Sequence, residues 1–549
     1  MKSGSSLPAG LLAAALALPL VGLGSPLLEV DDARYAEVPR AMAASGDWVL
    51  PSLNGMPYVE KPPLWYWTAA ASQKVFGASE ASARLPMLLI ALLGAAGVWW
   101  LGSWLYSAGT GRAAAGATAT AALWLFLTHN LTLDMPVSVF LLWTTALALR
   151  AMARPDDAHW AAPAAWLTAA LGFLSKGLIA LLLPGLWVVG LAVLFPKLRR
   201  GARRLLSPLG LLLFLAVVAP WFAALQRRRP DFLHTFFIEQ HFQRYLTPRY
   251  GRGAPWWFFL AVLPAGLLPW TVPALVGLGR AARPLDAADF RGPALAAWVL
   301  GVAVFFSISN SKLATYVLPA FPHACLIAVV TLEEGLPRWA AKLQRSLGAV
   351  LLAAAAVAAL AAGLLPARAW PPRGTSADAV RALVVLGPAL LACLGAALTA
   401  APSSHRPAVV LTAGGALAGL CLFLGLRAAA PLLSVKEAAL AVRQEARAED
   451  QLWTYGTYLH GLPFYYGRPV DKIVYFVGEF HYAKKDPAFA ERFGDDQDVR
   501  ALPRAAGRTF VLLRRFERPH FEKTVSGGAA SIASWRAFGR WSLAEVRTR

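Results

Sequence analysis

The sequence predicts an α-helical protein that crosses a membrane many times and ends in a small α/β domain. Three observations predict this fold class. The 549 residues are 57% hydrophobic and only 15% charged. Apolar runs of roughly 17–25 residues, the length that a helix needs to cross a bilayer, recur along the chain. Near Ser434 the character changes, and charged residues become frequent up to the C-terminus.

The apolar runs predict about thirteen membrane helices. The first lies within residues 1–28 and is expected to stay uncleaved, because no clear small-residue cleavage site precedes the acidic stretch that follows. Residues 1–433 are therefore expected to form the membrane domain. The other twelve spans are predicted near 83–106, 112–129, 134–153, 160–175, 177–195, 205–225, 256–279, 293–309, 313–332, 346–366, 378–400 and 407–430.

The basic residues predict the orientation of these spans. An N-terminus inside the cell places the basic loop 197–204 (KLRRGARR) on the cytoplasmic side, as the positive-inside rule requires. Loops 29–82 and 226–255 and the C-terminal domain then lie outside. The formal net charge of +21 follows largely from this bias, although some cations are expected to contact membrane lipids or hold an anionic lipid substrate. Nucleic acid is not an expected partner, because the Arg residues are spread over short loops.

Residues 434–549 predict one α/β domain on the outer side. A helical pattern is followed by three strand-like runs, LWTYG (452–456), KIVYFV (472–477) and TFVLLRR (509–515). The domain has no glycine-rich nucleotide fingerprint. The three cysteines lie in apolar segments without a Cys-x-x-Cys motif, so no zinc or redox motif is indicated.

The stretch 29–67 carries the strongest signal of a site. Charges this dense beside a bilayer are costly unless they face water or each other. Asp31 and Asp32 are adjacent, so their side chains point in different directions and need not share one task. Arg34 lies one helical turn after Asp31 and can share a face with it.

Three short segments in this stretch resemble a known family. They are DDARYAE (31–37), SGDW (45–48) and YVEKP (58–62). They resemble the polytopic GT-C glycosyltransferases that use polyprenyl-phosphate sugars, with the aminoarabinose transferases that modify lipid A as nearest relatives and protein O-mannosyltransferases more distant. The resemblance implies a bacterial inner-membrane enzyme with its active site facing the periplasm. It would move 4-amino-4-deoxy-L-arabinose from undecaprenyl phosphate to lipid A phosphate or another outer-face acceptor. Asp32, often Glu in that family, and 63–65 depart from the pattern and leave the sugar open.

The resemblance implies catalytic roles for Asp31, Arg34 and Asp134. Asp31 would act as general base toward a hydroxyl acceptor. With a phosphate acceptor it would instead orient the acceptor or stabilise positive charge on the sugar. The alternatives are structural: Asp31 as a helix cap, Arg34 in a local ion pair worth little, and Asp134 as a cap before Met135 and Pro136.

The donor phosphate and lipid are expected to be bound by cations and tyrosines. Lys61 is presented from a turn that two prolines stiffen. Lysines at a membrane edge often merely snorkel, yet Lys176 and Lys312 stand beside short polar residues. Tyr316, four residues after Lys312, is expected on the same helix face. The full predicted set is Tyr58, Lys61, Lys176, Arg244, Lys312 and Tyr316.

A metal is not expected to be required. Glu60 and His241 could hold a divalent cation, but two ligands distant in sequence are few for a metal site. His241 and Arg244 instead resemble a His-x-x-Arg segment of the family. Two alternative functions stay open: a protein O-mannosyltransferase or other sugar-lipid transferase, and a lipid transporter or flippase. A transporter would need charges deep in its spans and often repeated halves, which the sequence does not show.

Overall fold

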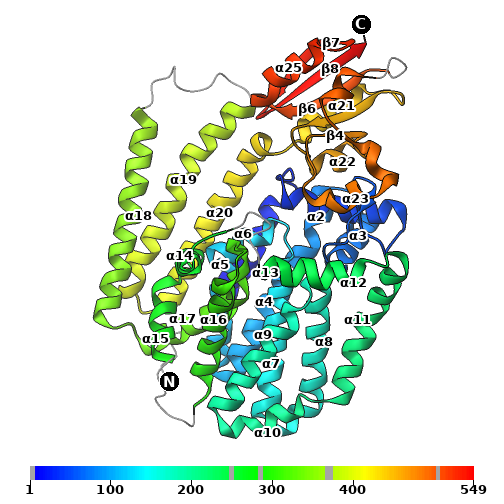
Figure 1. Cartoon of the computed structure of the whole chain (residues 1–549). Helices are drawn as coiled ribbons and strands as arrows, with labels where there is room; N and C mark the ends of the chain where they lie inside the picture. The colour runs from blue at the N-terminus through cyan, green and yellow to red at the C-terminus, as the bar shows by residue number, and fades with distance from the viewer. Residues whose placement is uncertain (1–6, 247–252, 282–288, 365–374, 503–506, 549) are drawn as a thin grey trace.

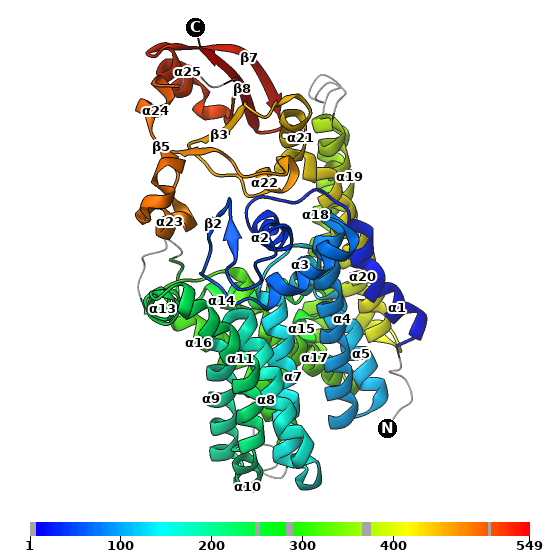
Figure 2. The same cartoon turned by 90° about the vertical axis from the view of Figure 1, so that its right-hand side faces the viewer.

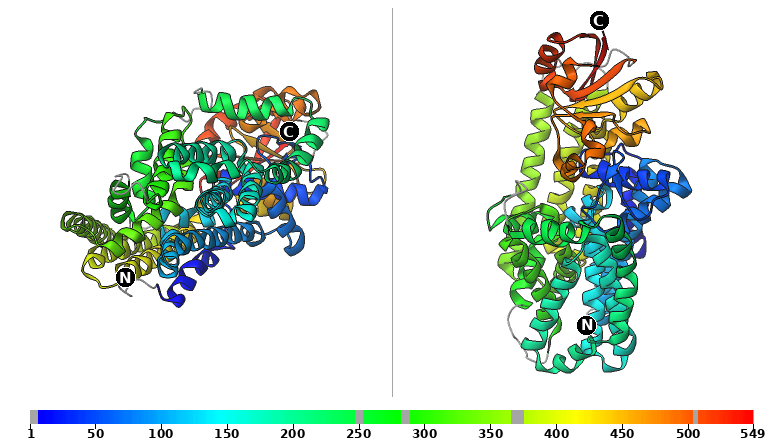
Figure 3. Two further views of the ribbon diagram at one scale, coloured as in Figure 1. Left: turned by 90° about the horizontal axis from the view of Figure 1, so that it is seen from below. Right: turned by 45° about the vertical axis from the view of Figure 1, so that its right-hand side comes forward.

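The computed structural model describes residues 7–246, 253–281, 289–364, 375–502 and 507–548. A long helical bundle carries a sheet domain on one end, and the basic helix α10 (Pro196–Arg204) lies at the other end (Figures 1 and 3). Within the described ranges, eight helical segments are long and apolar enough to cross a membrane. They are Glu80–Leu105 (α4), Asp134–Ala153 (α7), Pro208–Arg228 (α11), Arg291–Ile308 (α16), Ala314–Glu334 (η4 and α17), Arg338–Leu364 (α18), Ala379–Ser403 (in α19 and η6) and Pro407–Leu433 (α20).

The other predicted spans are helical but shorter, less apolar or broken. Ala9–Gly22 and Ile179–Leu194 are apolar but short. The run 112–129 divides at Ala121, whose backbone is extended. The run 256–279 divides around Pro269, which has no N–H to continue a helix. The corresponding elements are α1 (Ala9–Ala17) with η1 (Leu18–Gly22), α5 (Ala108–Thr120), α6 (Ala122–His129), α8 (Ala158–Lys176), α9 (Ile179–Leu194), α14 (Phe258–Gly266) and α15 (Thr271–Ala281).

The loop 29–82 folds into a small layer between the bundle and the sheet domain (Figure 2). It contains α2 (Asp31–Ser45), the hairpin strands β1 (Ser52–Leu53) and β2 (Met56–Pro57), and α3 (Leu64–Phe76). Helix α2 ends at Gly46, whose φ of +72° suits the residue without a side chain. Helix α3 starts only after Pro63, so Glu60 and Lys61 lie on the predicted non-helical turn.

The region predicted as loop 226–255 is helical in its described first part. Helix α11 is followed by α12 (Phe232–His234), the π-helix η3 (Thr235–Gln243) and α13 (Arg244–Leu246). This segment lies across the sheet-domain end of the bundle (Figure 1). It is fixed there because Phe232 and Phe236 are buried and pack against Phe222 of α11. Residues 247–252 lie outside the described part.

The C-terminal domain is built on a mixed six-stranded sheet in the order β5-β4-β3-β6-β8-β7. The three predicted strands are β3, β4 and β6; with β5 they are parallel, while β7 and β8 form an antiparallel hairpin that the sequence reading missed. The strands are β3 (Gln451–Tyr455), β4 (Lys472–Val474), β5 (Phe493–Gly494), β6 (Thr509–Arg514), β7 (Ala530–Phe538) and β8 (Trp541–Thr548). The helices are α21 (Lys436–Glu445), α22 (Gly461–Tyr466), α23 (His481–Lys485), α24 (Asp496–Arg500) and α25 (Arg518–Ser526).

Hydrogen bonds from the loop 29–82 fix the position of the sheet domain. The buried Asn54 side chain donates to the Val470 carbonyl at 3.1 Å and accepts the Val470 N–H at 2.7 Å. The Glu29 carboxylate accepts the N–H groups of His460 and Gly461, both at 2.8 Å. Because Glu29 stands just before α2, the sheet domain is held directly against that helix.

Candidate active site

A cavity of about 1120 Å³ lies where α2, the bundle and the sheet domain meet. Its wall along α9 is apolar, because Leu178, Leu182 and Leu186 recur on one face of the helix. Leu182 and Leu186 are also exposed on the surface of the bundle. The charged side chains that line the cavity are Asp31, Arg34, Glu60, Lys61, Asp134, Lys176 and Glu479. The site can therefore take a molecule with a polar head and an apolar tail.

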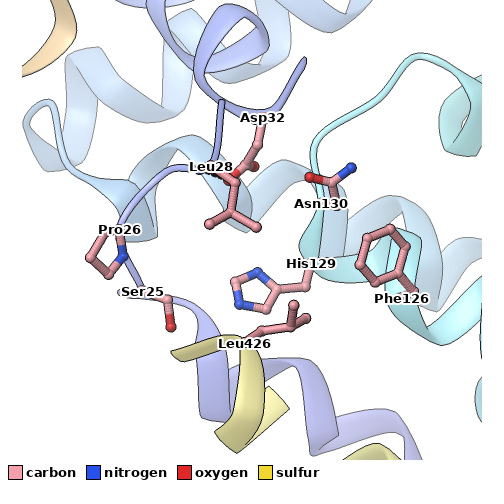
Figure 4. A pocket seen from close by; sticks show the side chains of 8 residues that line it. All are labelled: Ser25, Pro26, Leu28, Asp32, Phe126, His129, Asn130 and Leu426. Carbon is pink, nitrogen blue, oxygen red and sulfur yellow. Dashed lines mark hydrogen bonds between the residues drawn. The ribbon is translucent and has the colours of Figure 1, made fainter. Parts of the chain in front are cut away.

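Asp31 and Asp32 have separate environments. Asp31 lines the cavity, is half-exposed and pairs with Arg34 on the same face of α2. It is not the helix cap, since the cap position is Val30 and no side chain bonds there. Asp32 points away, into a buried ion pair with Arg84 at 2.5 Å, and accepts the N–H of Leu131 at 3.1 Å. It lines a different cavity of about 10 Å³ beside His129 (Figure 4).

Arg34 stays cationic although its side chain is largely buried. Burial favours its neutral form, but Tyr58 and other neighbours outweigh this and raise the pKa of Arg34 above its usual value. Its guanidinium lies 5.3 Å from the Tyr35 ring, and Nη1 lies 3.8 Å from Oε1 of Glu479. Burial also raises the pKa of Tyr58 well above its usual value, so this hydroxyl stays neutral and can donate a hydrogen bond.

Asp134, Lys176 and Tyr316 meet in the same cavity. The Lys176 ammonium pairs with Oδ1 of Asp134 and lies 4.6 Å from the centre of the Tyr316 ring. Oδ2 of Asp134 accepts the hydroxyls of Thr132 at 3.0 Å and Thr315 at 2.9 Å. The cap position of α7 is Leu133, so Asp134 does not play the capping role that was its structural alternative.

Lys312 differs from the other predicted cations. Its side chain is buried, donates to the Ser309 carbonyl and is not part of the cavity lining. The prediction that Lys312 and Tyr316 share a helix face is wrong. The backbone of Leu313 is extended, so the 3₁₀ helix η4 (Ala314–Ala320) begins only after Lys312. Of these two residues, Tyr316 lines the cavity and Lys312 does not.

Glu60, Lys61 and Tyr58 line the cavity together with His241. Both ring nitrogens of His241 make hydrogen bonds: Nδ1 donates to the Phe236 carbonyl at 2.6 Å, and Nε2 accepts the Leu178 N–H at 3.3 Å. The proton of this histidine is therefore assigned to Nδ1 by its partners. Within the described ranges, no three His, Cys, Asp or Glu side chains group as metal ligands. The side chain of Arg244 lies outside the described residues.

The sequence reading missed two residues of the site. Glu479 lines the cavity from the sheet domain, and no local pattern connects it with a site more than four hundred residues away. Gly177, between Lys176 and Leu178, has φ +84°, and a Cβ there would stand 2.3 Å from Nε2 of His241. A glycine directly after a helical run was the available signal for such a position.

Comparisons with known proteins show what the chain is similar to. Residues 60–223 match the family model described as dolichyl-phosphate-mannose-protein mannosyltransferase. Undecaprenyl phosphate-alpha-4-amino-4-deoxy-L-arabinose arabinosyl transferase 1 of Sodalis glossinidius is 35% identical over 60% of this chain and 59% of its own length. The corresponding transferase of Pectobacterium carotovorum is 33% identical over 65% and 64%. The chain thus spans about three-fifths of the length of these curated relatives.

Solved structures extend the similarity to nearly the whole chain. The crystal structure of ArnT from Cupriavidus metallidurans bound to undecaprenyl phosphate superposes with a TM-score of 0.82, at 27% identity, over 97% of both chains. The oligosaccharyltransferase of Archaeoglobus fulgidus, at 12% identity and a TM-score of 0.51, shares the fold alone. The chain is a multi-pass membrane protein that is similar in sequence to these aminoarabinose transferases and shares the fold of the ArnT structure.

Proposed function

We propose that the protein transfers 4-amino-4-deoxy-L-arabinose from undecaprenyl phosphate to lipid A phosphate on the outer face of the bacterial inner membrane. One observation carries the proposal: the cavity joins a cluster of carboxylates and cations to an apolar wall that continues onto the exposed face of α9. A polyprenyl-phosphate sugar would match these two parts of the cavity, because it has an anionic head and a long apolar tail.

The chemistry assigned to the site is displacement at the anomeric carbon with inversion. An oxygen of the acceptor forms the new bond to this carbon while the bond to the phosphate oxygen breaks, and undecaprenyl phosphate leaves. An acceptor phosphate is already ionised near neutral pH, so it needs no general base. Asp31 would then orient the acceptor or stabilise positive charge on the sugar, with Asp134 as the second carboxylate.

The leaving phosphate needs positive charge and hydrogen-bond donors. Lys61 and Lys176 supply the charge, and the Tyr58 and Tyr316 hydroxyls supply donors in the same cavity. Leu182 and Leu186 would contact the first isoprene units of the lipid. Lys312, buried beside Ser309, is assigned a supporting role rather than a direct contact. Arg244 is kept as a phosphate ligand on its resemblance to the family alone.

The proposal includes an orientation. About thirteen helical segments, including the short and broken ones, would cross the membrane, and residues 434–549 would form a periplasmic domain. Supporting this, α10 with its five Lys and Arg residues lies at the opposite end of the bundle from the sheet domain (Figure 1). No metal is assigned to the reaction, and what supports this is that both His241 nitrogens are already hydrogen-bonded.

The test is reconstitution of the purified protein in proteoliposomes. Undecaprenyl phosphate-linked aminoarabinose is supplied with lipid A, and mass spectrometry follows the addition of the amino sugar to lipid A. A second candidate, transfer from a mannosyl lipid to a protein hydroxyl, is suggested by the match of residues 60–223 to the mannosyltransferase model. Glycosylation of a Ser/Thr peptide from a mannosyl lipid, with lipid A unmodified in the parallel reaction, would overturn the proposal.

A further inference from the structure

Glu479 brings a carboxylate of the sheet domain into the cavity of the membrane domain. It lies on the short 3₁₀ turn η7 (Gly478–Phe480), which follows β4, and together with Gly478 it lines the cavity. Its Oε1 lies 3.8 Å from Nη1 of Arg34 on α2. The sheet domain is therefore part of the site wall.

A buried contact with His460 holds Glu479 in place. Its Oε1 pairs with Nε2 of His460, a side chain that is only 1% exposed. His460 is anchored in turn, because its backbone N–H donates to Glu29 at 2.8 Å and its Nδ1 lies 3.6 Å from the same carboxylate oxygen. A carboxylate held from behind in this way has a fixed direction, as recognition of one ligand group requires.

The charges of the cavity leave this carboxylate available for a ligand. In the described part of the chain, four carboxylates and three basic side chains line the cavity. Asp31 is paired with Arg34, and Asp134 with Lys176. Oε1 of Glu479 makes the contacts with His460 and Arg34, and Oε2 has no hydrogen-bond partner among the described residues.

We propose that Glu479 is a specificity-determining residue that accepts a hydrogen bond from the charged amino group of the donor sugar. The inference rests on the proposed function, whose donor carries a cation on the sugar besides the anionic phosphate. Glu60 is the competing carboxylate, but it is next to Lys61 in the chain and no described hydrogen bond fixes its side chain. The sheet domain would thus select an amino sugar, while the membrane domain binds the lipid phosphate.

The experiment compares two donors that differ in one group. Undecaprenyl phosphate carrying the 4-amino pentose is compared with the same lipid carrying a 4-hydroxyl, which is similar in size and neutral. The variants are Glu479→Gln, which keeps the shape and can still meet His460, and the control Glu491→Gln in the same domain, where Glu491 is exposed and lines no part of the cavity. For each protein kcat/KM is measured with both donors, and thermal melting reports on folding.

The wild type and Glu491→Gln should prefer the amino donor by roughly 10- to 100-fold, the range expected for a hydrogen bond to a charged group. Glu479→Gln should bring this ratio close to one, chiefly by losing activity with the amino donor. An unchanged ratio in Glu479→Gln, or an equal loss with both donors, would overturn the assignment and leave Glu479 a structural role. A wild type that transfers neither sugar would instead refute the proposed function.

Discussion

Asp31 and Asp32 are neighbours in the chain, yet their carboxylates line two separate cavities. Successive residues of a helix point about 100° apart. Asp31 therefore points toward Arg34 and the large cavity, and Asp32 toward the buried Arg84. Of these two identical side chains, Asp31 therefore belongs to the candidate site and Asp32 to the structural core.

Substitution of the two residues should separate activity from stability. Asp31→Asn should melt like the wild type but lose on the order of 100-fold or more in kcat, because an oriented charge at the reacting centre is removed. Asp32→Asn should lower the free energy of unfolding by roughly 3–5 kcal/mol, since it leaves Arg84 buried without its partner charge. Transfer assays and thermal melts in detergent measure both. A stable, inactive Asp32→Asn beside an active Asp31→Asn would reverse the assignment.

Gly177 should be required for the position of His241. Gly177→Ala places a Cβ 2.3 Å from Nε2 of His241 and forces a side chain onto a backbone with φ +84°. We expect at least a tenfold loss of kcat/KM, because the ring must leave the cavity wall. Gly190→Ala is the control in the following helix, where a Cβ meets nothing within 4 Å. Equal activity of the two variants would show that the His241 contact is dispensable.

The apolar wall of α9 should recognise the length of the lipid. Leu186→Ser puts a hydroxyl where the proposed tail lies and should raise KM for the undecaprenyl donor several-fold. KM for a donor shortened to a few isoprene units should change less. Val189→Ser changes an exposed side chain of the same helix that does not line the cavity, so it serves as the matched control. Equal KM changes for both donors would place the tail elsewhere.

Lys61 and Lys312 should respond differently to substitution. Lys61→Ala removes a charge from the cavity lining and should lower kcat by roughly 30- to 1000-fold, as expected for loss of one oriented ligand of the leaving phosphate. Lys312→Ala removes a buried side chain that donates to Ser309, so the melting temperature should fall. Steady-state kinetics and melting curves decide between the roles. A stable Lys312→Ala with the larger loss of kcat would return Lys312 to the phosphate site.

Metal removal should leave the rate unchanged. Both His241 nitrogens are hydrogen-bonded, and no trio of metal-ligating side chains occurs in the described ranges. Purified protein treated with EDTA and dialysed should keep its full turnover. Loss of activity that added zinc, magnesium or manganese restores would contradict this, and Glu60→Gln would then show whether the Glu60 side chain holds the ion.

The sequence located most of the helical segments and the charged stretch that contains α2. Hydropathy located the apolar segments, because crossing a bilayer demands a length that can be counted. It did not separate continuous helices from broken ones, since the break at Ala121 depends on one extended residue in an apolar run. The prediction that Lys312 shares a helix face with Tyr316 failed for a similar reason. It assumed helical spacing through Leu313, whose backbone is extended.

Contacts between distant parts of the chain were out of reach. Nothing near Asp32 in the sequence indicates Arg84, 52 residues away. Glu479 stands in an ordinary polar turn, and its role as a wall of the cavity follows only from the docking of the sheet domain on α2. The β7–β8 hairpin was missed, although its strands of nine and eight residues are the longest described in the sheet.

The hydrogen bonds to the Glu29 carboxylate have a consequence for the order in which the protein folds during synthesis. The two N–H groups that hold its carboxylate belong to His460 and Gly461, 431 and 432 positions later in the chain. A ribosome that has synthesised every membrane segment has therefore not yet supplied the anchor for the start of α2. A polypeptide truncated at Leu433 would insert into the membrane and remain without a finished catalytic centre. In the proposed orientation, the site would therefore be completed only when the sheet domain has been translocated.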